Sequence, residues 1–257
     1  MRKIFIDCGT HLGMGFSRLS AELNVDHTWE VFGFEANPIV FDEYVKNIES
    51  EKCPPLVDKN LHLENKAVWI SDEGIEFSLR GITKEHYSRV YEDGKDKTNP
   101  FYNTSWEPVL ANMAAEDHGL SKEEILDMPW DGGSCVKSLK DKIEDSEDRE
   151  ELYKWHEDVM VESIDLSKWI LDNFSKEDLI ILKMDIEGAE YTVLPKMIKD
   201  GSIGYINKAF IEWHDWIMPE YKDKTNALTV ALQDANVTVG CWYCWRLKLV
   251  IILLNVI

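Results

Sequence analysis

The sequence has few basic residues for its size. Its 257 residues include 28 lysines and arginines against 48 aspartates and glutamates, which gives a formal net charge of −20. A field of this sign repels a nucleic-acid duplex or an anionic membrane, and no long run of lysine and arginine offsets it. Nucleic acid is therefore not expected as a substrate, and only a focused basic channel would change that expectation.

Cysteines are also scarce, and long apolar runs are missing. The five cysteines are an odd number spread over the chain, which is typical of a reducing compartment, so we expect a cytoplasmic protein. The apolar stretch that begins at Ile4 covers about five residues, too few for the apolar region of a signal peptide. The apolar segment at 247–257 falls well short of the roughly twenty residues that span a bilayer, which favours a buried strand over a membrane-associating tail.

The chain does have the material for a core, because 44% of its residues are hydrophobic. Its first third alternates between strand and helix patterns. Strands are expected at 3–7, 30–34 and 62–70, and helices at 16–23 and 40–48. Alternating units at such short spacing predict a parallel sheet with helices on both faces.

The same alternation returns after residue 160. The run at 178–185 is almost continuously apolar, as expected for a strand buried on both faces. The other elements expected here are helices at 164–173, 191–198 and 225–235, a strand at 206–213, and strands at 237–241 and 247–256 that could close the sheet as a hairpin.

Between about residues 80 and 160 the regular pattern stops, and the sequence becomes polar, acidic and rich in tryptophan and tyrosine. We interpret this segment as an insertion, a substrate lid, within a single domain that spans residues 1–257. Its expected features are short helices at 106–115, near 121–124 and at 150–159, a flexible loop at 131–134 that could close over a cofactor, and three tryptophans, Trp106, Trp130 and Trp155, that could face sugar rings or pack onto the sheet.

The turn after the first strand, residues 7–13, reads DCGTHLG. Glycine after a strand lets the backbone approach a ligand closely, and the next helix presents free N–H groups there. Its glycines at positions 9, 13 and 15 do not fit the G-x-G-x-x-G spacing of a dinucleotide site. A tight turn without a ligand remains the alternative.

Glu35 ends the second strand, where an acid can accept hydrogen bonds from both hydroxyls of a ribose. An exposed glutamate at a strand end would look the same in the sequence. Because the glycine turn lies one strand–helix unit earlier, the two features together favour a nucleoside ligand.

Four charged residues, Lys183, Asp185, Glu187 and Glu190, follow or end the apolar strand at 178–185. Ligands bind at this edge of open α/β sheets. Lys183 inside the strand is costly to desolvate unless it meets a carboxylate, so we expect it to pair with a neighbouring acid. A purely structural ion-pair network is the alternative.

Residues 183–194, KMDIEGAEYTVL, resemble the hallmark K-x-D-x-E-G-x-E-x-x-x-L of the FkbM-type methyltransferase family. The resemblance covers about residues 3–79 and 160–235 and leaves the insertion unmatched. Further blocks follow in the family's order: FIDCGTHLG at 5–13, FEANP at 34–38, NKAVW at 65–69, ESIDLSKWI at 162–170 and FIEWH at 210–214. The blocks at 5–13 and 34–38 are shared widely among class I methyltransferases, whereas the hallmark is much more specific to the family.

This resemblance implies an α/β fold of the Rossmann-like class I methyltransferase type, a doubly wound and mostly parallel sheet of seven strands with the last one antiparallel. It also implies S-adenosylmethionine as cofactor and methyl transfer to a hydroxyl oxygen, commonly of a sugar, glycolipid or polyketide. The family's first motif usually reads D-x-G-A-N, and this chain departs from it with Thr10 and His11. The implied cofactor residues are Asp7, Gly9, Thr10 and Gly13 around the methionine part, Glu35 at the ribose, and Asn37, Asn65 and Ala67 near the adenine.

Methyl transfer to an alcohol needs an in-line arrangement and a group that removes the hydroxyl proton. The candidates at the strand ends are Asp185, Glu187, Glu212 and His214, and His214 is suited by an ordinary pKa near 6.5. We favour Asp185 with His214, and expect Lys183 to orient a carboxylate. Asp185, Glu187 and His214 could instead hold Mg²⁺ or Mn²⁺, but a metal site is not favoured.

Cys241 and Cys244 form a lone C-x-x-C pair, for which a structural role is favoured over zinc or redox chemistry.

Three functions thus remain open from the sequence. The favoured one is a methyltransferase that acts on a hydroxyl group of a small molecule or glycan. The alternatives are an NAD(P)-dependent oxidoreductase on a similar sheet and a non-catalytic nucleoside-binding module. The sequence leaves the acceptor and the oligomeric state open.

Overall fold

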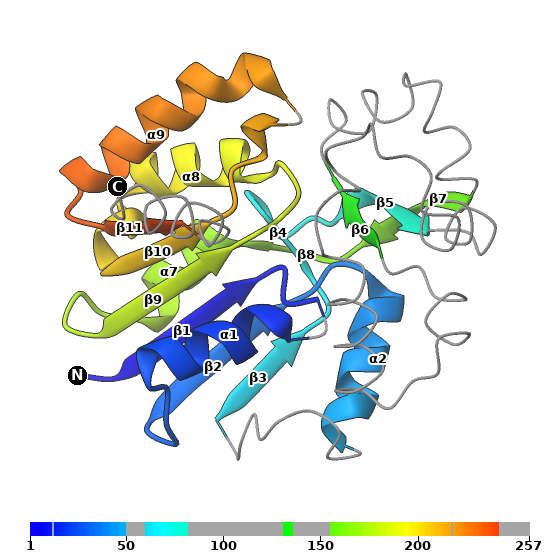
Figure 1. The fold of residues 1–257 in the computed structure, drawn as a ribbon, viewed down its shortest axis with the longest axis horizontal. Helices are drawn as coiled ribbons and strands as arrows, with labels where there is room; N and C mark the ends of the chain where they lie inside the picture. Colours follow the sequence, from blue (N-terminus) through cyan, green and yellow to red (C-terminus); the bar gives the residue numbers. More distant parts are fainter. Residues whose placement is uncertain (12, 50–59, 82–130, 136–154, 217, 242–257) are drawn as a thin grey trace, which may run out of the picture.

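A computed structural model describes residues 1–11, 13–49, 60–81, 131–135, 155–216 and 218–241 of the chain (Figure 1). Within these residues, six strands form one parallel sheet in the order β11-β10-β9-β1-β2-β3. The strands are β1 (Lys3–Cys8), β2 (Trp29–Phe34), β3 (Leu61–Glu64), β9 (Leu179–Met184), β10 (Lys208–Ile211) and β11 (Thr238–Cys241). The strand order reverses at β1, so the carboxyl ends of β1, β2 and β9 flank the place where open α/β sheets bind ligands.

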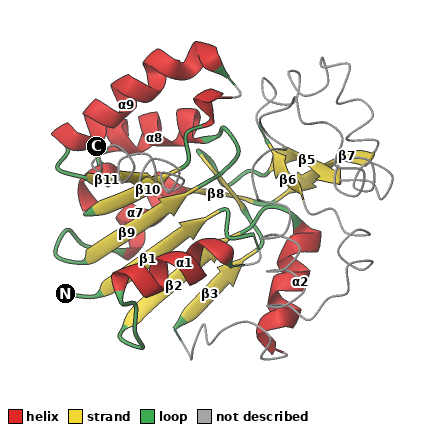
Figure 2. Ribbon diagram, viewed as in Figure 1, coloured by secondary structure: helices red, strands yellow, loops and turns green. Residues whose placement is uncertain are grey.

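Helices cover both faces of the sheet, as the alternating pattern predicts (Figure 2). Phe16 and Leu19 of α1 pack with Phe5 on one face. On the other face, Ile4 and Ile6 pack in a larger core with apolar side chains from three further helices. The helices are α1 (Met14–Leu23), α2 (Pro38–Glu49), α7 (Leu166–Asn173), α8 (Glu190–Asp200) and α9 (Lys222–Asp234), and α7, α8 and α9 supply the larger core.

The central strands β1 and β9 are apolar along most of their length because both of their faces are buried. Ile4, Phe5 and Ile6 in β1 and Ile180 and Leu182 in β9 are all fully enclosed. Such strands read as continuous apolar runs rather than as alternating ones. The predicted parallel core is therefore confirmed for the described strands.

The strand predicted at 62–70 is wrong as a single element. The chain turns at Asn65 and Lys66, where the Lys66 amide donates to the Glu64 carbonyl at 3.0 Å. Beyond this turn, β4 (Ala67–Trp69) leaves the main sheet and pairs in parallel with β8 (Ser163–Asp165). The helix predicted from residue 164 accordingly begins at Leu166, after β8, and the Asp165 side chain caps it by accepting from the Lys168 amide.

The described parts of the predicted insertion belong to a separate sheet of three strands. β5 (Ile75–Gly81), β6 (Asp131–Ser134) and β7 (Trp155–Val161) are antiparallel in the order β6-β5-β7. The helix predicted at 150–159 is therefore wrong from Trp155 onward, because Val161 is buried while its neighbour Met160 is exposed, the period of a strand. The loop predicted at 131–134 is likewise strand β6.

Several expectations fall outside the described residues. They are the helices at 106–115 and near 121–124, the side chains of Trp106, Trp130 and Trp155, Cys244, and the strand at 247–256 that would be the antiparallel seventh member of the sheet. The strand predicted at 237–241 is present as β11, and it runs parallel to β10.

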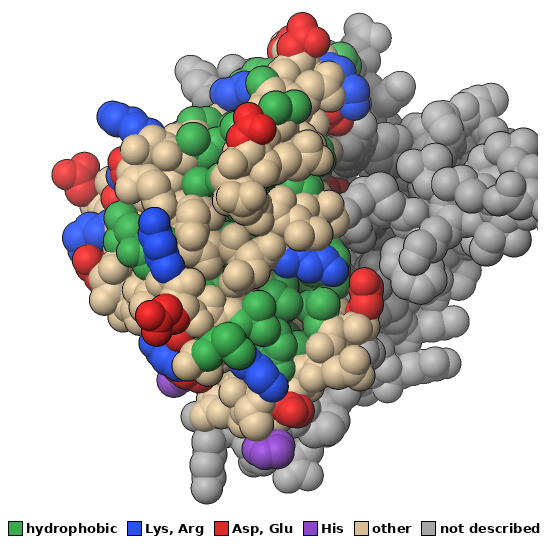
Figure 3. Space-filling view, turned by 90° about the vertical axis from the view of Figure 1, so that its left-hand side faces the viewer, with side chains coloured by type: hydrophobic (Ala, Val, Ile, Leu, Met, Phe, Trp, Pro, Cys, Tyr) green, Lys and Arg blue, Asp and Glu red, His purple; other side chains and the backbone are tan. Residues whose placement is uncertain are grey.

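Acidic, basic and hydrophobic side chains are interspersed on the face of the described residues that Figure 3 shows, so the negative charge is not gathered into one patch there. No helix among the described residues is both long enough and apolar enough to cross a membrane.

Candidate functional site

Four strands of the sheet end at the same level. In the register of the sheet Cys8 pairs with both Phe34 and Met184, and Met184 also pairs with Ile211. The next residue of each strand is thereby placed on one edge. These residues are Gly9, Glu35, Asp185 and Glu212, all of them predicted site residues.

The glycines of the first turn are required by contacts within the chain. Gly9 has φ +73°, and a Cβ atom on it would lie 1.9 Å from the carbonyl oxygen of Asp185. Gly13 has φ +82°, and a Cβ atom there would lie 2.5 Å from the hydroxyl of Tyr44. The turn thus locks the end of β1 against the end of β9 and against α2, in addition to any contact with a ligand.

Glu35 is 8% exposed and is held by the backbone on both sides. Its Oε2 accepts from the His11 amide at 2.8 Å, and its Oε1 accepts from the Asn37 amide at 2.8 Å. Burial raises the pKa of Glu35 to about 7, although these two backbone hydrogen bonds act in the opposite direction. The side chain therefore ties the turn after β1 to the start of α2 at a fixed position.

The remaining predicted cofactor residues surround this glutamate. The Asn65 side-chain amide donates to the Glu35 carbonyl at 2.7 Å. Asn37 is buried, and its Oδ1 accepts from the Val40 amide at 3.3 Å at the start of α2. Thr10 is also buried, and Ala67 lies in a small apolar cluster shared with β5 and β7. Each of these positions has a packing role of its own.

Lys183 and Asp7 form an ion pair inside the protein. The distance between Lys183 Nζ and Asp7 Oδ1 is 3.1 Å, and the side chains are 2% and 1% exposed. Lys183 also donates to the carbonyls of Cys8 and Gly9, and its Nζ lies 3.8 Å from Asp185 Oδ2. Burial alone would lower the pKa of Lys183, but the attraction of Asp7 and Asp185 outweighs it and raises that pKa. The predicted pairing of Lys183 with an acid is confirmed.

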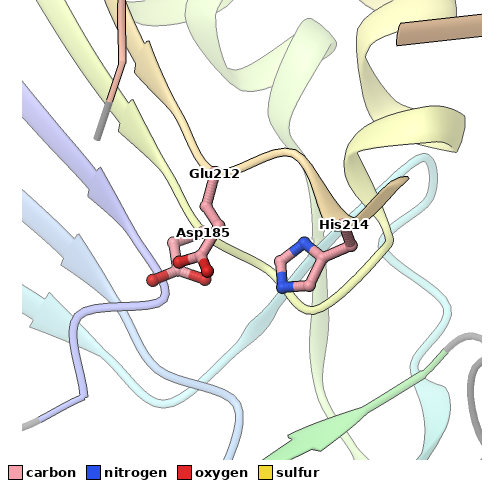
Figure 4. A group of neighbouring side chains, drawn as sticks. All are labelled: Asp185, Glu212 and His214. Carbon is pink, nitrogen blue, oxygen red and sulfur yellow. The ribbon is translucent and has the colours of Figure 1, made fainter. Parts of the chain in front are cut away.

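Asp185, Glu212 and His214 converge beyond the ends of β9 and β10 (Figure 4). One oxygen or nitrogen of each lies within 4.8 Å of the others. Burial and the neighbouring Asp185 carboxylate raise the pKa of Glu212 to about 10. At neutral pH, Glu212 therefore holds a proton in this arrangement.

His214 is 1% exposed and sits between two further carboxylates. Its Nδ1 lies 3.4 Å from Glu190 Oε2, and its Nε2 lies 3.5 Å from Glu187 Oε2. Burial by itself lowers the pKa of His214, but Glu190 and Glu187 outweigh burial and raise it well above the usual value. The two carboxylates thus favour the protonated form of the imidazole.

Glu190 is the site residue to which sequence reasoning gave no role. It is fully buried, its Oε1 accepts from the Ile186 amide at 2.8 Å, and its Oε2 faces His214. Glu187 and Gly188 both have positive φ, so the backbone turns sharply directly after Ile186. The position of Glu190 in the DIEGAE segment was the signal that could have predicted this role. Its carboxylate accepts from the Ile186 amide and also faces His214.

A family model described as the methyltransferase FkbM domain matches residues 7–236. The chain belongs to the FkbM methyltransferase family. The matched range runs from the end of β1 past α9, so it includes all of the residues described at this sheet edge. Comparisons with curated proteins and with solved structures gave no match.

An FkbM methyltransferase is an enzyme, and S-adenosylmethionine is the methyl donor that its family implies. This decides between the three functions left open by the sequence, against the oxidoreductase and the non-catalytic module. The residues present suit such a donor. Glu35 offers a buried, anchored carboxylate at the end of β2, and the Asp185 carboxylate beyond β9 suits a positively charged ligand.

Proposed function

We propose that this FkbM methyltransferase transfers a methyl group to a hydroxyl oxygen of a sugar, glycolipid or other small molecule. The observation that carries the proposal is the convergence of Asp185, Glu212 and His214 one to three residues beyond β9 and β10. It puts the Asp185 carboxylate, with Glu212 and His214 beside it, at the edge of the sheet where the family's donor would lie. S-adenosylmethionine, when bound, supplies an electrophilic methyl group on a sulfonium centre.

The proposed cofactor residues lie along the ends of β1, β2 and β3. Glu35 would accept hydrogen bonds from the ribose hydroxyls, since a carboxylate has acceptor capacity beyond the two backbone bonds that it already makes. The other proposed contacts are Asp7, Gly9, Thr10 and Gly13 with the methionine part, and Asn37, Asn65 and Ala67 with the adenine.

Asp185 is the proposed general base. Burial and Asp185 raise the pKa of Glu212, and Glu190 and Glu187 raise that of His214 against the effect of burial, so both groups favour their protonated forms. Asp185 has Lys183 Nζ at 3.8 Å to stabilise its negative charge, and its side chain is 20% exposed, so it can meet a hydroxyl group. Lys183, Glu212 and His214 then act as positioning residues around it.

Two measurements test this proposal. Calorimetry with S-adenosylmethionine and S-adenosylhomocysteine should give binding of both, and NAD should not bind. A methyl-transfer screen with labelled donor against sugars, glycolipids, amines and carboxylic acids should give products methylated on oxygen of a hydroxyl. Labelled products confined to amines or carboxylates would overturn hydroxyl transfer and leave the family assignment intact.

The segment between residues 80 and 160 is proposed to be the lid that selects the acceptor. Support comes from its described ends, since β5, β6 and β7 make a sheet whose apolar side packs against Ala36 and Ala67. These two residues flank the proposed adenine end of the site. A chain shortened between β5 and β6 should keep cofactor binding and lose acceptor selectivity.

A further inference from the structure

Asp185, Glu212 and His214 have the composition of a cation site as well as that of a proton-transfer site. Their ligand atoms lie within 4.8 Å of one another. Donors around one small divalent ion, at distances of about 2.1–2.2 Å, lie roughly 3.0 Å apart when they are neighbours and roughly 4.4 Å apart only when they face each other across the ion. Side-chain rotations that move the ligand atoms by about 1–2 Å would therefore bring all three onto a single ion.

The carboxylates of Asp185 and Glu212 lie beside each other in this group (Figure 4). The nearest lysine, Lys183, is committed to Asp7 at 3.1 Å and lies 3.8 Å from Asp185. A divalent ion would satisfy both carboxylates at once.

The setting of His214 is that of a metal-binding imidazole. Ligating histidines commonly turn their second ring nitrogen to a carboxylate, which fixes the ring and increases its basicity. The Oε2 atom of Glu190, a residue that is 0% exposed, lies 3.4 Å from Nδ1. The partner of Nε2 is Glu187, which is 38% exposed and can move away or join the ion as a further oxygen ligand.

We infer that Asp185, Glu212 and His214 Nε2 bind a divalent cation of the Mn²⁺ class. Two carboxylates favour hard ions such as Mg²⁺ and Mn²⁺, and the imidazole favours Mn²⁺ of these two. Three protein ligands leave positions for water or for an oxygen of the acceptor. Asp185 can ligate through one carboxylate oxygen and keep the other for a hydroxyl proton.

This site is a binding property of the free protein and does not depend on the identity of the acceptor. Methyl transfer could fail with every hydroxyl compound tested while Mn²⁺ still bound, and the reverse could also occur. The two proposals are therefore tested separately.

The test is a titration of the full chain, first freed of metal by chelation, with Mn²⁺ alone. Loss of the electron paramagnetic resonance signal of free Mn²⁺ should show one saturable site per chain, and Mn²⁺ should raise the melting temperature in a manner reversed by chelator. Glu212→Gln should weaken the binding at least tenfold. Asp200→Asn is the matched control, because it also removes one acid. Asp200 and Asp165 form another pair of carboxylates, and Lys196 already makes ion pairs with both.

A folded wild-type protein that shows neither saturable Mn²⁺ binding nor a shift in melting temperature would overturn the inference. Equal weakening in Glu212→Gln and Asp200→Asn would also overturn it, since binding would then follow net charge. If Glu212→Gln does not fold, Glu187→Gln serves in its place, and it should change the affinity measurably while the site still saturates at one ion. An unchanged affinity in Glu187→Gln, together with loss of binding in Asp200→Asn, would again contradict the site.

Discussion

Lys183 Nζ lies 3.1 Å from Asp7 Oδ1, and this pair is sealed beneath the turn that follows β1. Gly15 at the start of α1 leaves room for this buried pair, because a Cβ atom there would lie 3.0 Å from Lys183 Cε and 3.2 Å from Asp7 Oδ2. The pair connects β1 to β9 directly below the residues that would meet the donor and the acceptor. The ion pair therefore acts mainly by fixing the position of these site residues.

Removing one member of this pair should be strongly destabilising. Lys183→Met leaves Asp7 buried without its cation, which costs about 3–5 kcal/mol in free energy of unfolding. Urea denaturation measures this loss. Lys168→Met, which breaks the exposed pair of Lys168 with Asp172, should cause a much smaller change. Similar losses in the two variants would contradict the internal role, and adding Asp7→Asn to Lys183→Met should recover part of the stability.

Gly9→Ala should disrupt the junction of β1 with β9. Alanine at a positive φ costs roughly 1–2 kcal/mol, and here its Cβ would also meet the Asp185 carbonyl. We expect a total loss of about 3–5 kcal/mol, or an insoluble protein. Gly201→Ala is the control. Gly201 also has a positive φ, of +82°, but a Cβ atom there would meet nothing within 4 Å. Calorimetric melting of both variants separates the clash from the backbone strain, and equal effects would remove the clash from consideration.

The affinity for S-adenosylmethionine should fall at acid pH. Burial raises the pKa of Glu35 to about 7, so the ionised form that accepts ribose hydroxyls predominates only above that pH. Below pH 7, Glu35 must first lose its proton before the donor can bind. The affinity should therefore drop by up to about tenfold for each pH unit. Calorimetry between pH 5.5 and 8.5 (roughly the range around that pKa) measures it. Glu35→Gln should bind more weakly and lose this pH dependence, and an unchanged slope in that variant would place the titrating group elsewhere.

Asp185→Asn should abolish transfer more than binding. Loss of a general base lowers kcat by about 10²–10⁴-fold, whereas the ribose and adenine contacts proposed for Glu35 and Asn37 remain. The measurements are methyl transfer to an acceptor found by the screen and calorimetry with S-adenosylhomocysteine. Asp215→Asn changes a nearby carboxylate that already pairs with Lys222 at 3.0 Å, and should leave the rate nearly unchanged. An active Asp185→Asn enzyme would remove Asp185 from the base role.

The sequence was most informative where one local pattern decides the structure. The apolar runs of β1 and β9 predict buried parallel strands, and the charged residues directly after them, such as Asp185, predict the edge that carries the site. The resemblance carried by the DIEGAE segment predicts the family. All of these depend on residues that are neighbours in the chain.

The predictions failed where partners distant in the chain decide the structure. The residues of β4 look like a continuation of β3, and only their pairing with β8, almost a hundred residues later, takes them out of the main sheet. The strand β7 contains several polar residues, so its alternation is visible only once Phe77 and Leu79 of β5 lie beside it. The environment of His214 likewise depends on Glu187 and Glu190 across a loop, and the ordinary pKa of a histidine gave no indication that the pKa of this one is raised.

The anchoring of Glu35 has a consequence for how fast and how tightly a nucleoside can be captured. The carboxylate is already oriented by the amides of His11 and Asn37, so a ribose would meet a preorganised acceptor that loses little rotamer freedom on binding. Immobilising a flexible glutamate would cost about 0.5–1.5 kcal/mol at the moment of association. At this position, that entropy is given up when the chain folds, and the encounter with the donor need not wait for a side chain to reorganise.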